Sequence, residues 1–198
     1  MSRLLFVVVV ALGVSGPVIA SELHDAASAG DLAVAERLLA NGAKVDERGQ
    51  NAETPLIAAA LAGQREIAKM LLARGADVHA RNAGGFTPLH AAAYSGSVPV
   101  VVLLLEKGAK LDDADNEAGV TPLLVAAEEN HAPVVELLIS RGADVSKREV
   151  HGYTPLTRTF WKGHADIVRL LKRHGATCPP ADVLGGEAAY QQCITIGN

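Results

Sequence analysis

The side chains of this chain that could bind a metal ion are scattered along it. Among its seven histidines no pair has a short metal-ligand spacing, and neither His-Glu-x-x-His nor a Cys/His cluster occurs. The acidic run from Asp112 to Glu117 lacks the central glycine and the distant glutamate of a twelve-residue calcium loop. We therefore expect a solvated acidic loop at this run, no metal site and no cofactor.

Motifs of known enzyme classes do not occur either. The sequence has no Gly-x-Ser-x-Gly, no phosphate-binding loop and no dinucleotide fingerprint. We predict that the protein is not an enzyme.

Cys178 and Cys193 are the two cysteines, and both lie near the end of the chain without a Cys-x-x-Cys motif. In an oxidising compartment, pairing is the simplest interpretation. The bridge would close a 16-residue loop and stabilise it by roughly 3 kcal/mol. Two alternatives stay open: two reduced thiols, one of them buried, or a pair that cycles between thiol and disulfide.

Residues 1–20 have the pattern of a secretory signal peptide. Met-Ser-Arg precedes an apolar run, Leu4 to Val14, and Val18-Ile19-Ala20 forms a small-residue cleavage site before Ser21. The alternative is an inner-membrane anchor over residues 4–20, but a span needs about 20 apolar residues and this run is interrupted by glycine and proline. The absence of an Asn-x-Ser/Thr sequon favours a bacterial protein, and hence the periplasm.

After cleavage the chain would carry 17 basic and 22 acidic residues. This acidic balance argues against a phosphate-binding surface, and so against a nucleic-acid partner. No other segment is apolar enough to cross a membrane, and we expect a soluble monomer.

The remaining sequence is built from a repeated motif. Thr-Pro-Leu recurs at Thr54, Thr87, Thr121 and Thr154, in steps of 33, 34 and 33 residues, which is typical of stacked repeat proteins. Threonine followed by proline predicts the capped start of a first helix. A break residue after an alanine-rich stretch predicts its end, at Gly63, Gly96, Asn130 and Gly163. Apolar residues at helical spacing then predict a second, buried helix.

The repeat resembles the ankyrin-repeat family. Thr87-Pro88-Leu89-His90-Ala91-Ala92 matches that family's Thr-Pro-Leu-His-x-Ala motif, and a divergent first copy begins at Ser21. The resemblance implies an all-α solenoid of about five helix-turn-helix repeats with short finger hairpins. The predicted segments are a signal peptide (1–20), repeats 21–53, 54–86, 87–120, 121–153 and 154–177, and a C-terminal capping tail (178–198).

The resemblance also gives the histidines structural places. His24 and His90 occupy the motif position whose imidazole ties neighbouring turns, whereas His131 and His164 follow the break residue. The finger before Thr121 carries one extra residue and should be longer and acidic.

Members of the family bind partner proteins through finger tips and the exposed ends of the first helices, which line a concave face. Aromatic and arginine side chains carry most of the energy of such interfaces, and four of the six aromatic residues after position 20 fall on these positions. The candidate partner-binding residues are Arg48, Arg81, Phe86, Tyr94, Val120, Glu128, Arg148, Tyr153, Trp161 and Lys162.

Two other interpretations remain at this stage. Phe86 and Tyr153 could shield the finger bases and Trp161 could pack against the tail, instead of binding a partner. The resemblance to exported bacterial ankyrin-like proteins, some associated with peroxide protection, also keeps open a redox-responsive accessory protein that uses Cys178 and Cys193.

Overall fold

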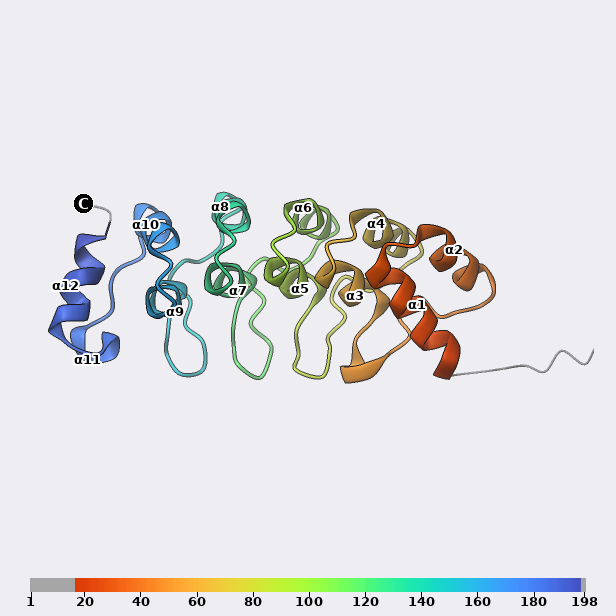
Figure 1. The fold of residues 1–198 in the computed structure, drawn as a ribbon, viewed down its shortest axis with the longest axis horizontal. Helices are drawn as coiled ribbons and strands as arrows, with labels where there is room; N and C mark the ends of the chain where they lie inside the picture. Colours follow the sequence, from red (N-terminus) through yellow and green to blue (C-terminus); the bar gives the residue numbers. More distant parts are fainter. Residues whose placement is uncertain (1–16, 197–198) are drawn as a thin grey trace, which may run out of the picture.

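A computed structural model describes residues 17–196, and over this range it contains helices and loops but no strand. Five helix pairs stack side by side (Figure 1). The pairs are α1 (Pro17–Ala29) with α2 (Leu32–Ala40), α3 (Pro55–Leu61) with α4 (Arg65–Ala73), α5 (Pro88–Tyr94) with α6 (Val98–Glu106), α7 (Pro122–Glu128) with α8 (Ala132–Ser140), and α9 (Pro155–Trp161) with α10 (Ala165–Arg173). The predicted all-α solenoid of five helix pairs is confirmed.

The first helices α3, α5, α7 and α9 begin where the Thr-Pro pattern predicts, whereas α1 already begins at Pro17, before the predicted start of the first repeat at Ser21. Thr54 Oγ1 accepts a hydrogen bond from the Ile57 amide at 3.3 Å, and Thr121 Oγ1 accepts one from the Leu124 amide at 3.2 Å. Each hydroxyl thus satisfies an amide that has no partner within the helix. These helices end two residues before the predicted break residues, among them Asn130, whose φ of 63° is left-handed.

Two rows of helices form the core. The first helices α3, α5, α7 and α9 make one row and the second helices make the other (Figure 1). Alanines Ala59, Ala92 and Ala126 are fully buried between neighbouring first helices, and their small side chains permit close packing. Large leucines of the second helices fill the space between the rows, and those fully buried are Leu71, Leu104, Leu138 and Leu171.

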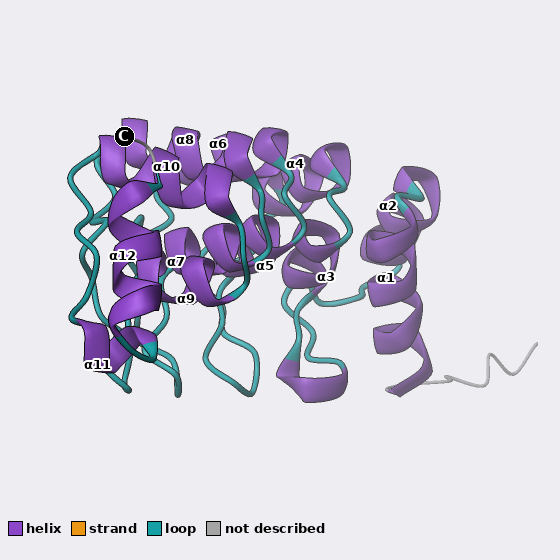
Figure 2. Cartoon of the chain, turned by 60° about the vertical axis from the view of Figure 1, so that its left-hand side comes forward, coloured by secondary structure: helices purple, strands orange, loops and turns teal. Residues whose placement is uncertain are grey.

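The fingers are loops that project from the ends of the first helices (Figure 2). The predicted hairpins therefore lack β-ladders within residues 17–196. Neighbouring fingers are instead joined by backbone hydrogen bonds: Ala83 N to Asn51 O at 2.6 Å, and Val150 N to Ala118 O at 3.1 Å. The finger that leads into the second repeat carries a 3₁₀ turn, η1 (Gln50–Ala52).

The acidic finger is only partly the solvated loop that we expected, because Asp115 and Glu117 are exposed but Asp113 and Asp112 are not. Asp113 is buried, because the Arg81 guanidinium of the preceding finger binds its carboxylate. Asp112 is partly buried and accepts hydrogen bonds from the Asp144 amide of the next repeat. Both carboxylates therefore link repeats to one another.

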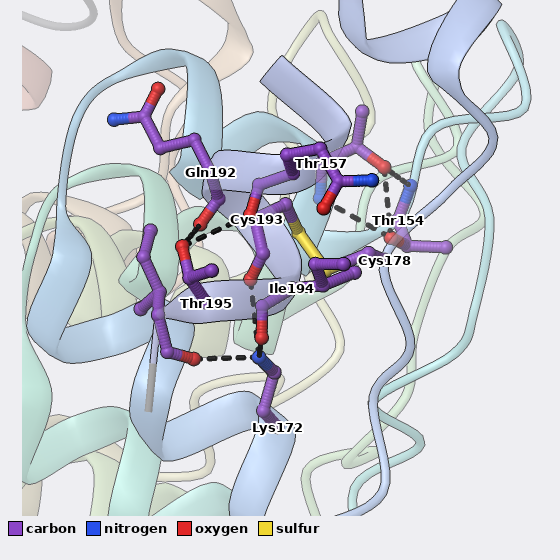
Figure 3. The surroundings of a disulfide bond; sticks show 10 residues. Thr154, Thr157, Lys172, Cys178, Gln192, Cys193, Ile194 and Thr195 are labelled. Carbon is purple, nitrogen blue, oxygen red and sulfur yellow. Dashed lines mark hydrogen bonds between the residues drawn. A yellow bond between two sulfur atoms is a disulfide. The ribbon is translucent and has the colours of Figure 1, made fainter. Parts of the chain in front are cut away.

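The tail closes the C-terminal end of the stack with α11 (Ala181–Leu184) and α12 (Glu187–Thr195). The predicted bridge between Cys178 and Cys193 is confirmed (Figure 3), and Cys193 is fully buried. Lys172 Nζ donates to the carbonyls of Cys193, Ile194 and Ile196 at 3.1, 2.9 and 2.6 Å. The corresponding residues of the inner repeats are apolar and pack against the core, namely Leu72, Leu105 and Ile139.

The N-terminal prediction lies largely outside the described residues, which begin at Pro17. Helix α1 passes through the predicted cleavage site between Ala20 and Ser21. Within residues 17–196 no helix is both long and apolar enough to span a membrane.

Candidate binding groove

A groove of about 640 Å³ lies where the finger bases meet the first helices of repeats two to five. Three rows of side chains line it. The first row consists of the residues directly before the repeat threonines, namely Glu53, Phe86 and Val120. The second row lies three or four residues after these threonines and consists of Ile57, His90, Ala91, Leu124, Val125 and Arg158. The third row consists of the last residues of the first helices, Leu61, Tyr94 and Glu128.

The helix-end row is exposed and mainly apolar. Leu61, Tyr94 and Trp161 are the last residues of α3, α5 and α9, and they are 43, 53 and 44 % exposed. Glu128 holds the same position in α7. These four residues, one per repeat, are called the ladder below. Of the five large apolar residues exposed within residues 17–196, three belong to the ladder.

The backbone of the ladder is fixed by the neighbouring repeat. His131 Nε2 donates to the Tyr94 carbonyl at 2.8 Å, and His164 Nε2 donates to the Glu128 carbonyl at 3.1 Å. These histidines, predicted as scaffold, thereby satisfy carbonyls at the ends of α5 and α7, which would otherwise lack a partner within the helix. The backbone of Tyr94 and Glu128 is therefore held by the repeat that follows each of them.

His90 lies in the groove but is committed to the fold. Its Nε2 donates to the Val120 carbonyl at 3.1 Å, and its Nδ1 accepts from the Thr87 amide at 3.2 Å. Burial lowers the pKa of His90 by more than the hydrogen bond to Val120 and the charge of Asp113 raise it. The imidazole is thus held neutral, and the predicted tie between neighbouring turns is present, as it is for His24 and the Glu53 carbonyl at 2.8 Å.

The structure brings together four of the ten predicted partner-binding residues in the groove: Phe86, Tyr94, Val120 and Glu128. Phe86 also packs edge-on against His90, with ring centroids 5.5 Å apart. It therefore both lines the groove and shields the finger base.

Tyr153 and Trp161 form a cluster beyond the last groove residue. Their ring centroids lie 4.7 Å apart in an edge-on arrangement, and His151 stacks on Tyr153 at 6.2 Å. The ring contact of Trp161 is thus with Tyr153. Beneath the cluster, burial raises the pKa of Glu149, but hydrogen bonds from His151 and from the Tyr153 amide lower it by more, so the pKa lies below its ordinary value.

Lys162 reaches back toward the groove. Its Nζ lies 3.5 Å from Glu128 Oε1, and the two side chains are 52 and 24 % exposed. An ion pair this exposed contributes little to stability, so both groups remain accessible to a ligand.

The three predicted arginines bind their own fingers. Arg48, Arg81 and Arg148 each donate through Nη1 to the carbonyl four residues later, at 2.9, 2.8 and 2.6 Å. Arg48 also donates to the Arg81 carbonyl. Their guanidinium groups therefore hold the fingers in place, and none of the three lines the groove.

Arg158 lines the groove and was not among the predicted residues. Its Nη2 lies 3.8 Å from Glu149 Oε2, its guanidinium covers the Tyr153 ring at 5.7 Å, and within the described structure its buried Nε has no hydrogen-bond partner. The sequence could have indicated Arg158 as unusual, because the second, third and fourth repeats have the apolar residues Ala58, Ala91 and Val125 at this position.

Three glutamates line the groove. Glu128 and Glu129 end α7, and Glu53 lies at the second-repeat end. No group of His, Cys, Asp or Glu within residues 17–196 is arranged to hold a metal ion. The groove thus combines apolar and aromatic surface with acidic groups.

Comparison with known proteins agrees with the architecture. A family model described as ankyrin repeats (3 copies) matches residues 23–115 and 111–182. No match was found among curated proteins.

Proposed function

The chain belongs to the ankyrin-repeat family, whose members are generally protein–protein interaction modules, and from this we propose that it binds a partner protein in the groove. The observation that carries the proposal is the exposure of Leu61, Tyr94 and Trp161 at one repeat position. Aromatic side chains that lose water contact on binding contribute most to interface energy.

A catalytic role is disfavoured by the chemistry of the groove. A general base must be free to accept a proton from a substrate, but both ring nitrogens of His90 are engaged with Thr87 and Val120. Arg158 is held by Glu149 and Tyr153. Neither His90 nor Arg158 is therefore available as a catalytic group, which favours a binding role for the groove.

Export to the periplasm is the second part of the proposal. It rests on the signal-like pattern of residues 1–20 and agrees with the disulfide, which persists in oxidising compartments. Intact-mass measurement on protein from its native host should give a chain that begins at Ser21. A chain that retains Met1 in a membrane fraction would instead support the anchor.

The binding proposal is tested with a photo-crosslinking amino acid placed at Tyr94 or, as a matched control, at Leu32, which is 38 % exposed on α2. A partner should crosslink from position 94 and not from position 32. Tyr94→Ala should then weaken its binding by about 2 kcal/mol or more, roughly 30-fold, with little change in melting temperature.

Leu104→Ala serves as the folding control. Because Leu104 is fully buried, its truncation should lower the free energy of unfolding by roughly 2–5 kcal/mol. Should Tyr94→Ala unfold the chain as Leu104→Ala does, while affinity per folded molecule stays unaltered, the ladder is packing surface and the proposal is wrong.

A further inference from the structure

We infer that the groove takes an extended segment of the partner that presents a lysine or arginine to Glu128 and Glu129, with apolar side chains three residues away on either side. This inference rests on the proposed function. It commits to the chemistry and the conformation of the occupant.

The first reason is the charge at the end of α7. The carbonyl end of a helix carries partial negative charge, so a carboxylate there is unfavourable by about 0.3–1 kcal/mol. Nevertheless α7 ends in Glu128 and is capped by Glu129. The first helices α3, α5 and α9 end in Leu61-Ala62, Tyr94-Ser95 and Trp161-Lys162. A local rule of helix stability that is broken at one repeat points to a functional use of the two carboxylates.

The second reason is that these carboxylates are incompletely neutralised. Lys162 meets Glu128 in an exposed pair, whereas Glu129 and Glu53 have no ion pair among the described residues. The cation that lines the groove, Arg158, is offset by the buried Glu149 behind it. The groove is therefore complementary to a basic side chain.

The third reason is the spacing of the ladder. Its residues follow one another at one per repeat, and packed helices lie about 8–10 Å apart. A polyproline II segment has three residues per turn and rises about 3.1 Å per residue, so every third side chain returns to the same face after about 9 Å. A β-strand instead returns its side chains to the same face every second residue, a period that does not match the ladder. The ladder thus matches an extended segment that places one apolar residue against Tyr94 in the groove, a basic residue against Glu128, and a second apolar residue against Trp161 just beyond the groove.

The experiment is selection of a random twelve-residue peptide library, displayed on phage, on the folded chain, with counter-selection on the Tyr94→Ala variant. The enriched sequences should contain a lysine or arginine flanked by apolar residues at a spacing of three. Enrichment of acidic or uncharged sequences, or of apolar residues at the i, i+3, i+4, i+7 spacing of a helix, would overturn the inference.

Charge reversal then tests the contact itself on an enriched peptide. Glu129→Lys should weaken its binding at least tenfold, and changing the peptide's basic residue to glutamate should restore the affinity of that variant. Glu136→Lys, at an exposed position on α8, is the matched control and should change affinity less than twofold. Equal effects of both variants, or none, would show that the carboxylate is not contacted.

Failure of the underlying function gives a different result. If no peptide is enriched over the Tyr94→Ala variant, the groove does not bind segments of this kind and the proposed function itself is contradicted. If peptides are enriched and depend on Tyr94 but not on Glu129, only the choice of a basic segment is wrong.

Discussion

Arg81 and Asp113 join the fingers that lead into the third and fourth repeats, here called the third and fourth fingers, through two parallel hydrogen bonds, Nη1 to Oδ1 at 3.0 Å and Nη2 to Oδ2 at 2.7 Å. The Asp113 side chain is 4 % exposed and that of Arg81 27 %. Arg81 Nη1 additionally donates to the Asp115 carbonyl at 2.7 Å. The longer fourth finger is thereby attached to the third at its base.

Asp113→Asn should lower the free energy of unfolding by about 1–3 kcal/mol, because a buried amide replaces the acceptor of two charge-assisted hydrogen bonds. Urea unfolding at neutral pH measures the change. Asp115→Asn is the control, since the Asp115 side chain is 91 % exposed, and it should cost less than about 0.5 kcal/mol.

The same substitution should change the acid sensitivity of the protein. Burial raises the pKa of Asp113, but hydrogen bonds from Arg81 and from the Asp115 amide, with the charge of Arg81, lower it by more, so the folded pKa lies below its ordinary value. The associated stability is present above the unfolded pKa of about 3.9 and is lost as pH falls through the folded pKa. If the unfolding free energy of Asp113→Asn falls with pH as steeply as that of the wild type in this acid range, Asp113 is not the group responsible for the acid sensitivity.

His90→Leu should remove a separate pH dependence at higher pH. Since the folded pKa of His90 is lowered mainly by burial, the unfolded chain binds the proton first, and stability falls as pH drops below about 6.5. Leucine stands at this position in the fourth repeat, where Thr121 caps the Leu124 amide, so the variant should fold with a change within about 1.5 kcal/mol at pH 7.5. Thermal unfolding between pH 7.5 and 5.5 tests this, and an unchanged slope would contradict it.

Periodicity predicted the starts of α3, α5, α7 and α9 and the threonine caps, and the family resemblance predicted the histidine ties. All of these depend on residues at fixed offsets within one repeat or between adjacent ones. Periodicity did not predict the Arg81–Asp113 pair, because the extra residue in the fourth finger shifts the register there. Arg158 was missed for a related reason. A repeat position indicates which way a side chain leaves the backbone, but not where a long guanidinium group finds its partners.

The predicted partner-binding residues also include some that line the groove and others whose side chains lie elsewhere. Tyr94 and Glu128 follow from their place at the end of a helix. Arg48 and Arg148 were predicted from their place on the fingers, but their guanidinium groups fold back onto carbonyls of the same finger. Their assignment to the partner-binding surface remains a prediction that a binding measurement on Arg148→Ala can test.

Ala52→Gly should stabilise the protein by about 0.5–1 kcal/mol. Ala52 has a φ of 54°, and glycines occupy the equivalent position of the later fingers, for example Gly85 at 80° and Gly152 at 83°. A left-handed conformation destabilises a residue that has a side chain by about 1–2 kcal/mol. Glycine avoids this cost, but its greater flexibility in the unfolded chain cancels part of the gain. Differential scanning calorimetry should show a higher melting temperature.

The reverse substitutions provide the control. A Cβ at Gly152 would meet no atom within 4 Å, whereas at Gly85 it would lie 2.8 Å from the Asn116 Cα. Gly152→Ala should therefore cost about 1–2 kcal/mol through its φ alone, and Gly85→Ala distinctly more. Equal costs would mean that the contact between the third and fourth fingers relaxes freely.

Lys172→Met should loosen the tail and leave the repeats intact. Lys172 Nζ binds three carbonyls at the end of α12, whereas methionine retains the length of the side chain but donates no hydrogen bond. Hydrogen exchange should accelerate over residues 187–196 and stay unchanged over α5 to α8. Acceleration throughout the chain would show that the tail stabilises the whole stack instead of covering its end.

Reduction of Cys178–Cys193 should act on the same segment and cost no more than roughly 3 kcal/mol, the loop-closure contribution of a bridge of this size. Because Cys193 is fully buried, a reducing thiolate reaches its sulfur only after the tail opens. A structural bridge of this kind should have a reduction potential below about −300 mV. Thiol titration in glutathione and dithiothreitol buffers measures it. A potential near −200 mV, with rapid exchange in the folded protein, would instead favour a redox-responsive role, and Lys172→Met should then speed the exchange by opening the tail more often.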